Sequence, residues 1–229
     1  MTAPVSADVV AELRAQLVDR HQELVRYGLV VWTAGNVSAR IPGTDRFLIK
    51  ASGVRYETLG PDQMVLCDLD GNLAEESELS PSSDTAAHAY VYRAMPEVGG
   101  VVHTHSPYAC AFAAVHKPIP CVLTGIADEF GGEIPVGPFA RIGDDSIGQG
   151  IVATLSGHRS KAVLMANHGV FTVGENATAA VKAAVLCEDS ARSVHLSLSL
   201  GAAVPIAEAD IDALYARYQN IYGQRHGPT

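Results

Sequence analysis

The chain has 229 residues, a hydrophobic content of 48% and a formal net charge of −9, from 25 acidic and 16 basic side chains. This length and apolar content suffice for one large hydrophobic core, and we expect a single domain over residues 1–229. The basic residues form no run that could follow a phosphate backbone, so nucleic acid is not an expected partner. No apolar stretch approaches the ~20 residues of a membrane span, and the first residues lack the pattern of a secretion signal. We therefore expect a cytoplasmic protein without a membrane partner.

Helical and extended patterns alternate along the first hundred residues. Apolar residues at spacings of three and four predict an amphipathic helix over residues 8–27. A side-chain oxygen of Ser83 or Asp84 can cap a second helix that reaches about residue 95. Short β-rich runs bounded by Gly, Pro and Asn predict strands at residues 29–32, 47–50 and 64–68.

The second half of the chain continues this alternation. No internal repeat or low-complexity linker indicates a domain boundary. The segments together predict a mixed α/β fold around a central sheet. We expect strands or extended segments at 100–103, 122–127 and 161–166, and helices at 107–116, 177–200 and 211–218.

Three histidines are candidate metal ligands. His103 and His105 stand two residues apart at the end of a Val- and Gly-rich run, and alternate residues of a strand point to the same face. Zinc usually takes four ligands, so a third donor must come from elsewhere in the sequence. His168, which follows another apolar run and precedes Gly169, is the expected third ligand. Taken alone, the first pair also fits ordinary strand residues, and His88 is the competing histidine.

Four ordered motifs resemble the class II aldolase/adducin family, and the resemblance covers roughly residues 9–224. It implies a single α/β domain with a central, largely antiparallel sheet flanked by helices, and a homotetramer with active sites at the subunit interfaces. It also implies that His103, His105 and His168 bind Zn²⁺, or another divalent metal such as Mn²⁺ or Co²⁺. The motifs are Thr33-Ala34-Gly35-Asn36-Val37-Ser38-Ala39-Arg40, Pro81-Ser82-Ser83-Asp84, Val101-Val102-His103-Thr104-His105-Ser106 and Asn167-His168-Gly169-Val170.

The resemblance further implies that loops bind the phosphate of a small sugar substrate. Glycine-rich turns expose backbone amides and serine hydroxyls add donors, so such loops can bind a phosphate dianion without basic side chains. Taken alone, each of these segments also fits an ordinary turn. The lysines lie outside the motifs, so neither Lys50 nor any other lysine is assigned a Schiff-base role. The residues implied for phosphate binding are Gly35, Asn36, Ser52, Gly53, Ser82 and Ser83.

Three residues are candidates for proton transfer. Asp84 stands where the aldolase-type pattern has a glutamate and the epimerase-type pattern an aspartate, and it would be a fourth metal ligand, a movable acid–base group or a helix cap. Asp128 matches an acid–base aspartate of the epimerase-type pattern, but Ile126 replaces the histidine before it, and Thr124 replaces a tyrosine of the aldolase-type pattern. Tyr222 matches a C-terminal tyrosine of both patterns, although alone it also fits an aromatic tail residue packed on a neighbour.

The resemblance implies a metal-dependent enzyme that breaks a C3–C4 bond by retro-aldol chemistry, with the metal as Lewis acid. The first expectation is a zinc-dependent class II aldolase that reversibly cleaves a phosphorylated ketose, such as L-fuculose 1-phosphate, to dihydroxyacetone phosphate and an aldehyde. The alternative is a 4-epimerase of a pentulose phosphate such as L-ribulose 5-phosphate. The two aspartates favour the epimerase, whereas Ile126 argues against it. The aldolase is placed first because its chemistry needs fewer specific residues. A non-catalytic, adducin-like scaffold is the third alternative, against which the three retained histidines speak.

Overall fold

The computed structural model describes residues 6–221, and its seven strands form one sheet in the order β3-β2-β1-β4-β7-β6-β5. Neighbouring strands run antiparallel, except that β5 and β6 are parallel. The expected α/β fold with a largely antiparallel sheet is therefore confirmed. The strands are β1 (Asn36–Arg40), β2 (Arg46–Lys50), β3 (Met64–Asp68), β4 (Gly100–Thr104), β5 (Val136–Gly137), β6 (Ala162–Met165) and β7 (Val170–Gly174).

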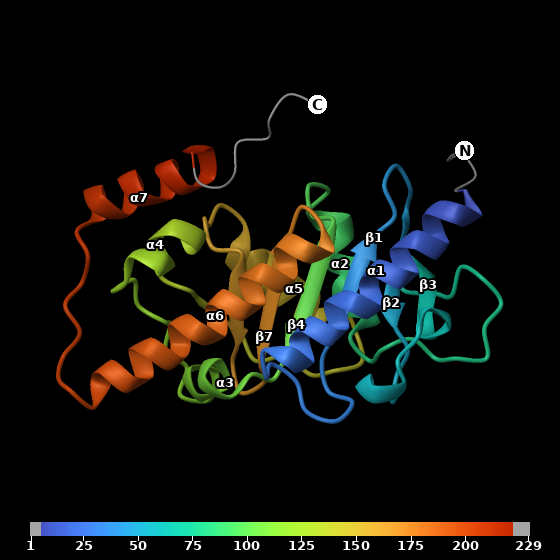
Figure 1. Cartoon of the computed structure of the whole chain (residues 1–229), viewed down its shortest axis with the longest axis horizontal. Coiled ribbons are helices and arrows are strands. Elements are labelled where there is room, and N and C mark those ends of the chain that lie inside the picture. The colour runs from blue at the N-terminus through green and yellow to red at the C-terminus, as the bar shows by residue number, and fades with distance from the viewer. Residues whose placement is uncertain (1–5, 222–229) are drawn as a thin grey trace.

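Helices cover both faces of the sheet (Figure 1). Helices α1 and α6 pack on one face, and α2 and α5 pack together on the other. Helices α4 and α7 pack on each other at one end of the molecule, beyond the strands (Figure 1). The α-helices are α1 (Ala7–Arg26), α2 (Thr85–Ala94), α3 (Pro107–Ala114), α4 (Thr124–Phe130), α5 (Ser146–Leu155), α6 (Ala177–Leu198) and α7 (Glu208–Ile221).

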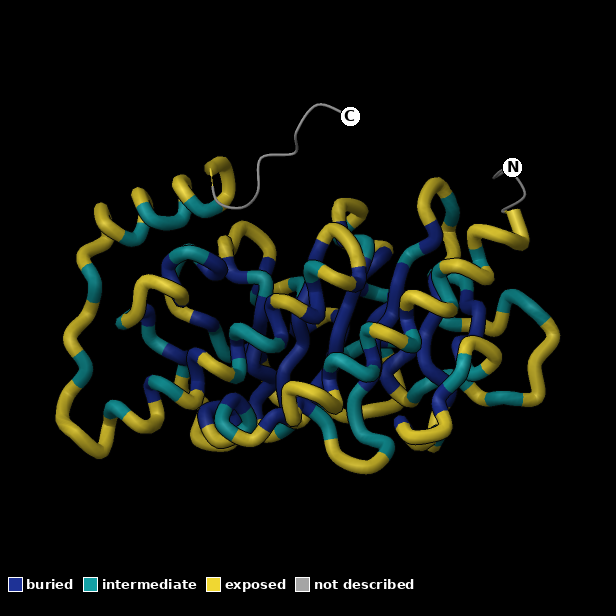
Figure 2. Tube along the Cα trace, viewed as in Figure 1, coloured by how far each residue is buried: buried dark blue, intermediate teal, exposed yellow. Residues whose placement is uncertain are grey.

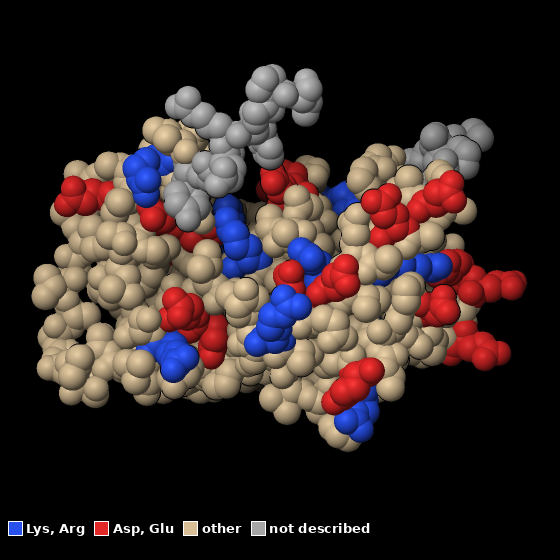
Figure 3. All heavy atoms as spheres, in the orientation of Figure 1, with Lys and Arg blue, Asp and Glu red and all other residues tan. Residues whose placement is uncertain are grey.

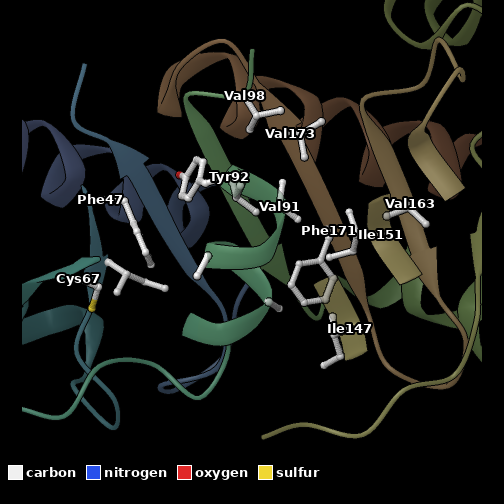
Figure 4. Close-up of a cluster of buried hydrophobic side chains, with 14 of the residues drawn as sticks. Phe47, Cys67, Val91, Tyr92, Val98, Ile147, Ile151, Val163, Phe171 and Val173 are labelled. Atoms are coloured by element: carbon white, nitrogen blue, oxygen red, sulfur yellow. The ribbon is translucent and has the colours of Figure 1, made fainter. Parts of the chain in front are cut away.

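Alternating side chains of the strands build a separate core on each face of the sheet. Val101 of β4 belongs to the core under α2 and α5, whereas the next residue, Val102, belongs to the core under α1 and α6. Figure 4 shows the first of these cores, where Phe171 of β7 lies beside Ile147 and Ile151 of α5. Buried segments accordingly run along the central strands, and exposed segments lie in the loops around them (Figure 2).

Two sequence-based predictions of strands are wrong. Residues 29–32 form no strand but lead from α1 into a turn at Trp32, whose positive φ of 61° cannot continue a strand. The second half of the segment 122–127 begins α4, which ends where Gly131 takes the left-handed conformation with φ 63°. The other predicted helices and strands are present, with ends shifted by a few residues.

The sequence patterns also missed β1, β5, β7 and α5. Helix α5 was not predicted because Gly148 and Gly150 lie within it and glycine disfavours a helix. Gly148 allows α5 to approach α2, since a Cβ there would lie 2.6 Å from Cβ of Tyr90 and 2.7 Å from the carbonyl oxygen of Ala87. The helix is thus stabilised by tertiary packing and not by its own propensity.

The surface carries both signs of charge. On the face shown in Figure 3, Lys and Arg side chains are interspersed with Asp and Glu and form no continuous basic stripe. Within residues 6–221, no helix is long and apolar enough to cross a membrane.

Candidate metal centre

Three histidine side chains meet at the end of β4. His103 belongs to β4, His105 directly follows the strand, and His168 lies in the turn between β6 and β7. One ligand nitrogen from each lies within 4.8 Å of those of the other two. The Nε2 atoms of the first pair are 2.9 Å apart. The structure thus brings together the three histidines that the sequence selects as metal ligands.

Strand pairing and one glycine explain how these side chains approach each other. Antiparallel pairing of β4 with β7 aligns Thr104 with Val170, which sets the turn before β7 beside the end of β4. A Cβ at Gly169 would lie 2.8 Å from Cδ2 of His105 and 3.2 Å from Cε1 of His103. A larger residue at position 169 would therefore clash with both imidazole rings.

Burial keeps the imidazoles of His103 and His168 neutral. It lowers the pKa of His103 to about 3 and also lowers the pKa of His168. The Nδ1–H of His103 donates to the carbonyl oxygen of Val170 at 2.9 Å, which leaves the lone pair of Nε2 free to bind an ion. Neutral imidazole is the form that binds metal, so the site needs little proton release near pH 7.

The histidines line a cavity of about 190 Å³ together with the predicted phosphate-binding loops. The cavity is lined by residues from the turn before β1, from the end of β2 and from the segment before α2. Its lining comprises Thr33, Ala34, Gly35, Asn36, Lys50, Ala51, Ser52, Gly53, Ser82, Ser83, Asp84, His103, His105, Ile142 and His168. All six residues predicted for phosphate binding are among them.

Asp84 directs its carboxylate into this cavity and not to the helix that follows. It stands at the N-cap position of α2, yet its side chain makes no capping hydrogen bond, so the interpretation as a helix cap is wrong. Its Oδ2 instead accepts a hydrogen bond from Nδ2 of Asn36 at 2.7 Å. Asn36 of β1 pairs with His103 of β4, so strand register sets this amide beside the metal ligands.

The Asp84 carboxyl group is ionised at neutral pH. Burial opposes its ionisation, but attraction to the imidazoles of His103 and His88 and the hydrogen bond from Asn36 outweigh burial, so its pKa lies below the usual value. Because His103 and His88 are themselves neutral near pH 7, the hydrogen bond from Asn36 is the contribution that persists there. A carboxylate is thus available as a ligand or as a base.

Two observations show that the residues fit a divalent cation. Both ring nitrogens of His168 are buried and have no hydrogen-bond partner. The Oδ1 atom of Asp84 is also buried without a partner. Unsatisfied lone pairs of this kind are costly unless a ligand binds them. Imidazole nitrogens with one carboxylate form a donor set that suits zinc and related divalent metals.

Lys50 is a cavity residue that the sequence motifs did not reveal. It ends β2 and is only 2% exposed, and its Nζ donates to the carbonyl oxygens of Ala51 and Thr33 at 3.3 and 3.5 Å. Burial lowers the pKa of Lys50 to about 8. It places a positive charge among loops that otherwise bind through neutral donors. Its position directly before Ala51-Ser52-Gly53 is the sequence signal that could have identified it.

Asp128, the second acid–base candidate, is not among the described residues that line this cavity. Asp128 lies on α4, where its Oδ2 is 3.8 Å from a guanidinium nitrogen of Arg217 and its carbonyl oxygen accepts from Gln219. Both partners belong to α7, so Asp128 faces the C-terminal helix of its own chain. Tyr222 lies outside the described residues.

His88, the competing histidine, lies behind the site and outside the group of three. Its Nδ1 is 2.7 Å from Oγ of Ser38, which is in turn 2.7 Å from the hydroxyl of Tyr92. These buried side chains connect α2 to β1, and burial lowers the pKa of His88 to about 4. Within residues 6–221, the side chains grouped closely enough to hold a metal ion are those of His103, His105 and His168.

Buried neutral histidines predict a loss of stability at mildly acidic pH. Burial lowers the pKa of His21 to about 3 in the folded chain, where Nε2 accepts from the backbone N–H of Val37. The unfolded chain binds the proton near pH 6.5, so this contribution to stability is complete above pH 6.5 and is lost as pH falls towards 3. Each such histidine should reduce the free energy of unfolding by ~1.4 kcal/mol per pH unit.

Urea unfolding at pH 7, 6 and 5.5 measures this slope. The variant His21→Gln should have a shallower slope, by a difference that approaches one proton as the pH falls below 6. Comparison with the native chain cancels the contribution of every other group. Equal slopes for the two proteins would contradict the prediction.

Comparison with known proteins gives the family of the chain. The model of the class II aldolase and adducin N-terminal domain matches residues 15–195. An L-ribulose-5-phosphate 4-epimerase UlaF of Salmonella paratyphi B is 36% identical over 230 residues, covering 95% of this chain and 96% of the relative. A probable L-ribulose-5-phosphate 4-epimerase UlaF of Mycoplasma pneumoniae is 44% identical over 127 residues, covering 56% of this chain and 52% of the relative.

Solved structures agree with the fold. An L-fuculose 1-phosphate aldolase superposes with a TM-score of 0.82 at 24% identity, covering 94% of this chain and 98% of the other. The L-fuculose-1-phosphate aldolase of Thermus thermophilus superposes with a TM-score of 0.70 at 28% identity, covering 85% of this chain and 100% of the other. These relatives are named as 4-epimerases and aldolases, and the expectation of a metal-dependent enzyme, an aldolase or a 4-epimerase, is confirmed. The chain belongs to the class II aldolase and adducin family.

Proposed function

We propose that the chain is a metal-dependent 4-epimerase of a pentulose phosphate of the L-ribulose 5-phosphate type. The observation that carries this proposal is the similarity, over nearly the whole length of both chains, to an L-ribulose-5-phosphate 4-epimerase. The histidine cluster and Asp84 support it, since they supply a metal site and a carboxylate within one cavity. The sequence motifs alone left the aldolase as the first expectation, whereas the relatives favour the epimerase.

The proposed reaction inverts C4 by breaking and remaking the C3–C4 bond. A divalent ion held by His103, His105 and His168 would act as a Lewis acid for the negative charge that develops on the substrate oxygens. The chain itself must then remove the proton of the C4 hydroxyl group, retain both fragments while the aldehyde turns over, and return a proton to the new C4 oxygen. Retention requires that the phosphate stays bound throughout.

Asp84 is the described residue best placed to transfer the proton. It is a buried carboxylate with one oxygen held by Asn36 and the other without a partner, so a single oxygen is free to accept a proton. The amide of Asn36 also donates to Oγ of Ser82 at 3.0 Å. This network fixes the carboxylate between the histidines and the serine loop, where both ends of a small substrate would lie.

Lys50 and the neighbouring loops would bind the phosphate. We predict that Lys50→Met raises KM by roughly 10- to 100-fold and changes kcat less, because a charge-assisted hydrogen bond contributes about 1.5–3 kcal/mol. Since the pKa of Lys50 is about 8, KM of the native enzyme should also rise above pH 8, where the ammonium loses its charge. Steady-state kinetics from pH 7 to 9 test both effects, with the exposed Lys117→Met as the control. A KM that stays independent of pH and of Lys50→Met would contradict this assignment.

The proposal includes features that lie beyond a single described chain. We infer a cytoplasmic homotetramer, with Zn²⁺ as the metal and with active sites at subunit interfaces. Asp128 and Tyr222 remain the proposed partners of Asp84 in acid–base catalysis. Asp128 is not among the residues that line the cavity of its own chain, so it would reach a substrate from a neighbouring subunit. Sedimentation analysis of the purified enzyme tests the tetramer.

An aldolase acting on a phosphorylated ketose such as L-fuculose 1-phosphate is the second candidate. Ile126 favours it, because the epimerase-type pattern has a histidine there. Two assays decide between the functions. In the first, L-ribulose 5-phosphate is supplied and xylulose 5-phosphate is measured; in the second, L-fuculose 1-phosphate is supplied and dihydroxyacetone phosphate is measured. Formation of dihydroxyacetone phosphate alone would overturn the epimerase proposal.

A further inference from the structure

Helix α3 connects two of the three histidines of the metal centre. His105 precedes it by two residues, and the turn that contains His168 lies against its C-terminal end. We propose that α3 acts as a strut that sets the separation of these two ligands, and that Asn167 and His116 are positioning residues at its C-terminal end. The inference rests on the metal site of the proposed function.

His168 needs an external support for its orientation. The ring of His103 is fixed by a hydrogen bond from Nδ1 to a backbone carbonyl group, whereas neither ring nitrogen of His168 has a hydrogen-bond partner. Its direction therefore comes from the backbone of the turn that carries it and from the packing of its ring against Phe171 and the other two imidazoles. In metalloproteins such supporting contacts typically change metal affinity by about 10- to 100-fold.

Asn167 ties this turn to α3 through both its backbone and its side chain. Its backbone N–H donates to the carbonyl oxygen of Ala113 at 3.1 Å, and its Nδ2 donates to that of Ala114 at 3.5 Å. Its Oδ1 accepts from Nε2 of His116 at 2.6 Å. Three hydrogen bonds thus converge on the residue directly before a metal ligand.

The backbone at both positioning residues is unusual. Asn167 has a φ of 55° and His116 a φ of 53°, both in the left-handed region that residues with a Cβ seldom adopt. Such a conformation persists only where surrounding contacts impose it. Both side chains are exposed, so core packing does not supply those contacts. At His116 the backbone bonds that close α3 supply them, since its N–H donates to the carbonyl oxygen of Ala113 at 3.3 Å. At Asn167 they come from its hydrogen bonds to α3 and to His116.

The N-terminal end of α3 is held by another element. The carboxylate of Glu188, on α6, accepts from the backbone N–H groups of Tyr108 and Ala109, at 2.9 Å each. Ser106 at the N-cap position makes no capping bond of its own. A negative charge at a helix N-terminus is favourable, and here it anchors the first turn of α3 two residues after His105. Both ends of the strut are therefore fixed to the rest of the fold.

Measurements of metal affinity test the role of α3 separately from catalysis. The dissociation constant for Co²⁺ is measured by competition with a chelator, and the visible spectrum of the bound Co²⁺ reports its coordination geometry. We expect Asn167→Gly and His116→Ala each to weaken Co²⁺ binding by roughly 10-fold or more and to alter the spectrum, as supporting residues do in other metal sites. The glycine retains the left-handed backbone and removes only the side-chain bonds. Asn167→Ala should weaken binding further, because it also disfavours that backbone.

Matched controls separate the possible outcomes. Asn220→Ala removes an exposed amide that donates to a backbone carbonyl group on α7, and it should bind Co²⁺ like the native chain. Unchanged affinity and spectrum in a folded His116→Ala variant would overturn the strut even if the Asn167 variants failed to fold. Absence of Co²⁺ binding by the native chain would overturn the metal site itself, and the strut with it.

Discussion

Replacing His168 with alanine should remove metal binding and activity together. The variant loses one of three nitrogens that converge within 4.8 Å, and the other two ligands cannot hold the ion in the same geometry. Lewis-acid stabilisation is worth several kcal/mol, so we expect kcat to fall by about 1,000-fold or more. Metal content per chain and kcat are measured on the same preparation, before and after reconstitution with Zn²⁺.

A histidine elsewhere in the fold gives the control. His195 is exposed on α6, and His195→Ala should retain metal and activity. Full activity of His168→Ala at wild-type metal content would exclude this histidine as a ligand. Full activity without metal would exclude the Lewis-acid role and with it the proposed mechanism.

Replacing Asp84 with asparagine should lower kcat by roughly 100- to 10,000-fold, the range for loss of a general acid–base group. The substitution keeps the size of the side chain and removes the charge and the basicity. Metal content then distinguishes the two roles of Asp84. Loss of activity with metal retained identifies it as the acid–base group, and loss of both identifies it as a ligand.

Asp145 offers a matched control, because it occupies the N-cap position of α5 as Asp84 does that of α2. Asp145→Asn should leave kcat unchanged. An Asp84→Asn variant with kcat within about fivefold of the native value, and with metal retained, would remove Asp84 from the proposed mechanism, since acid–base groups contribute far more than that.

Sequence patterns predicted the long helices and the strands that carry His103 and Lys50, but they missed β1, which supplies Asn36 to the site. Strand β1 was missed because Asn36 and Ser38 are polar although they are 2% and 0% exposed. Their burial serves the site, as Asn36 binds Asp84 and Ser38 binds His88. A prediction that assigns polar residues to the solvent-exposed surface therefore fails where a strand buries polar side chains that serve the site. The segment at 122–127 failed for another reason, since its short apolar run fits a strand or a helix equally well.

Some residues of the site could be predicted from the sequence and others could not. The spacing of His103 and His105 suggested a shared metal, and the place of His168 between an apolar run and Gly169 suggested the third ligand. The resemblance to a family supported that choice over the competing histidine, His88. Lys50 adjoins the Ser52-Gly53 loop in the sequence, but its burial arises from how β2 meets the loops around it. Tertiary packing creates that environment, and no run of neighbouring residues encodes it.

We expect the C-terminal helix to be less stable than the rest of the fold. Within its described part, α7 has no buried residue, and an exposed segment, 199–207, connects it to α6. It packs on α4, and its partly buried Ile211 and Leu214 contact the core beneath it. The surface ion pairs of Arg217 with Asp128 and of Arg159 with Asp212 contribute little. We therefore expect local opening of α7 to cost less than global unfolding. Such opening would move the C-terminal end of the enzyme while the metal ligands, which lie on other elements, stay fixed.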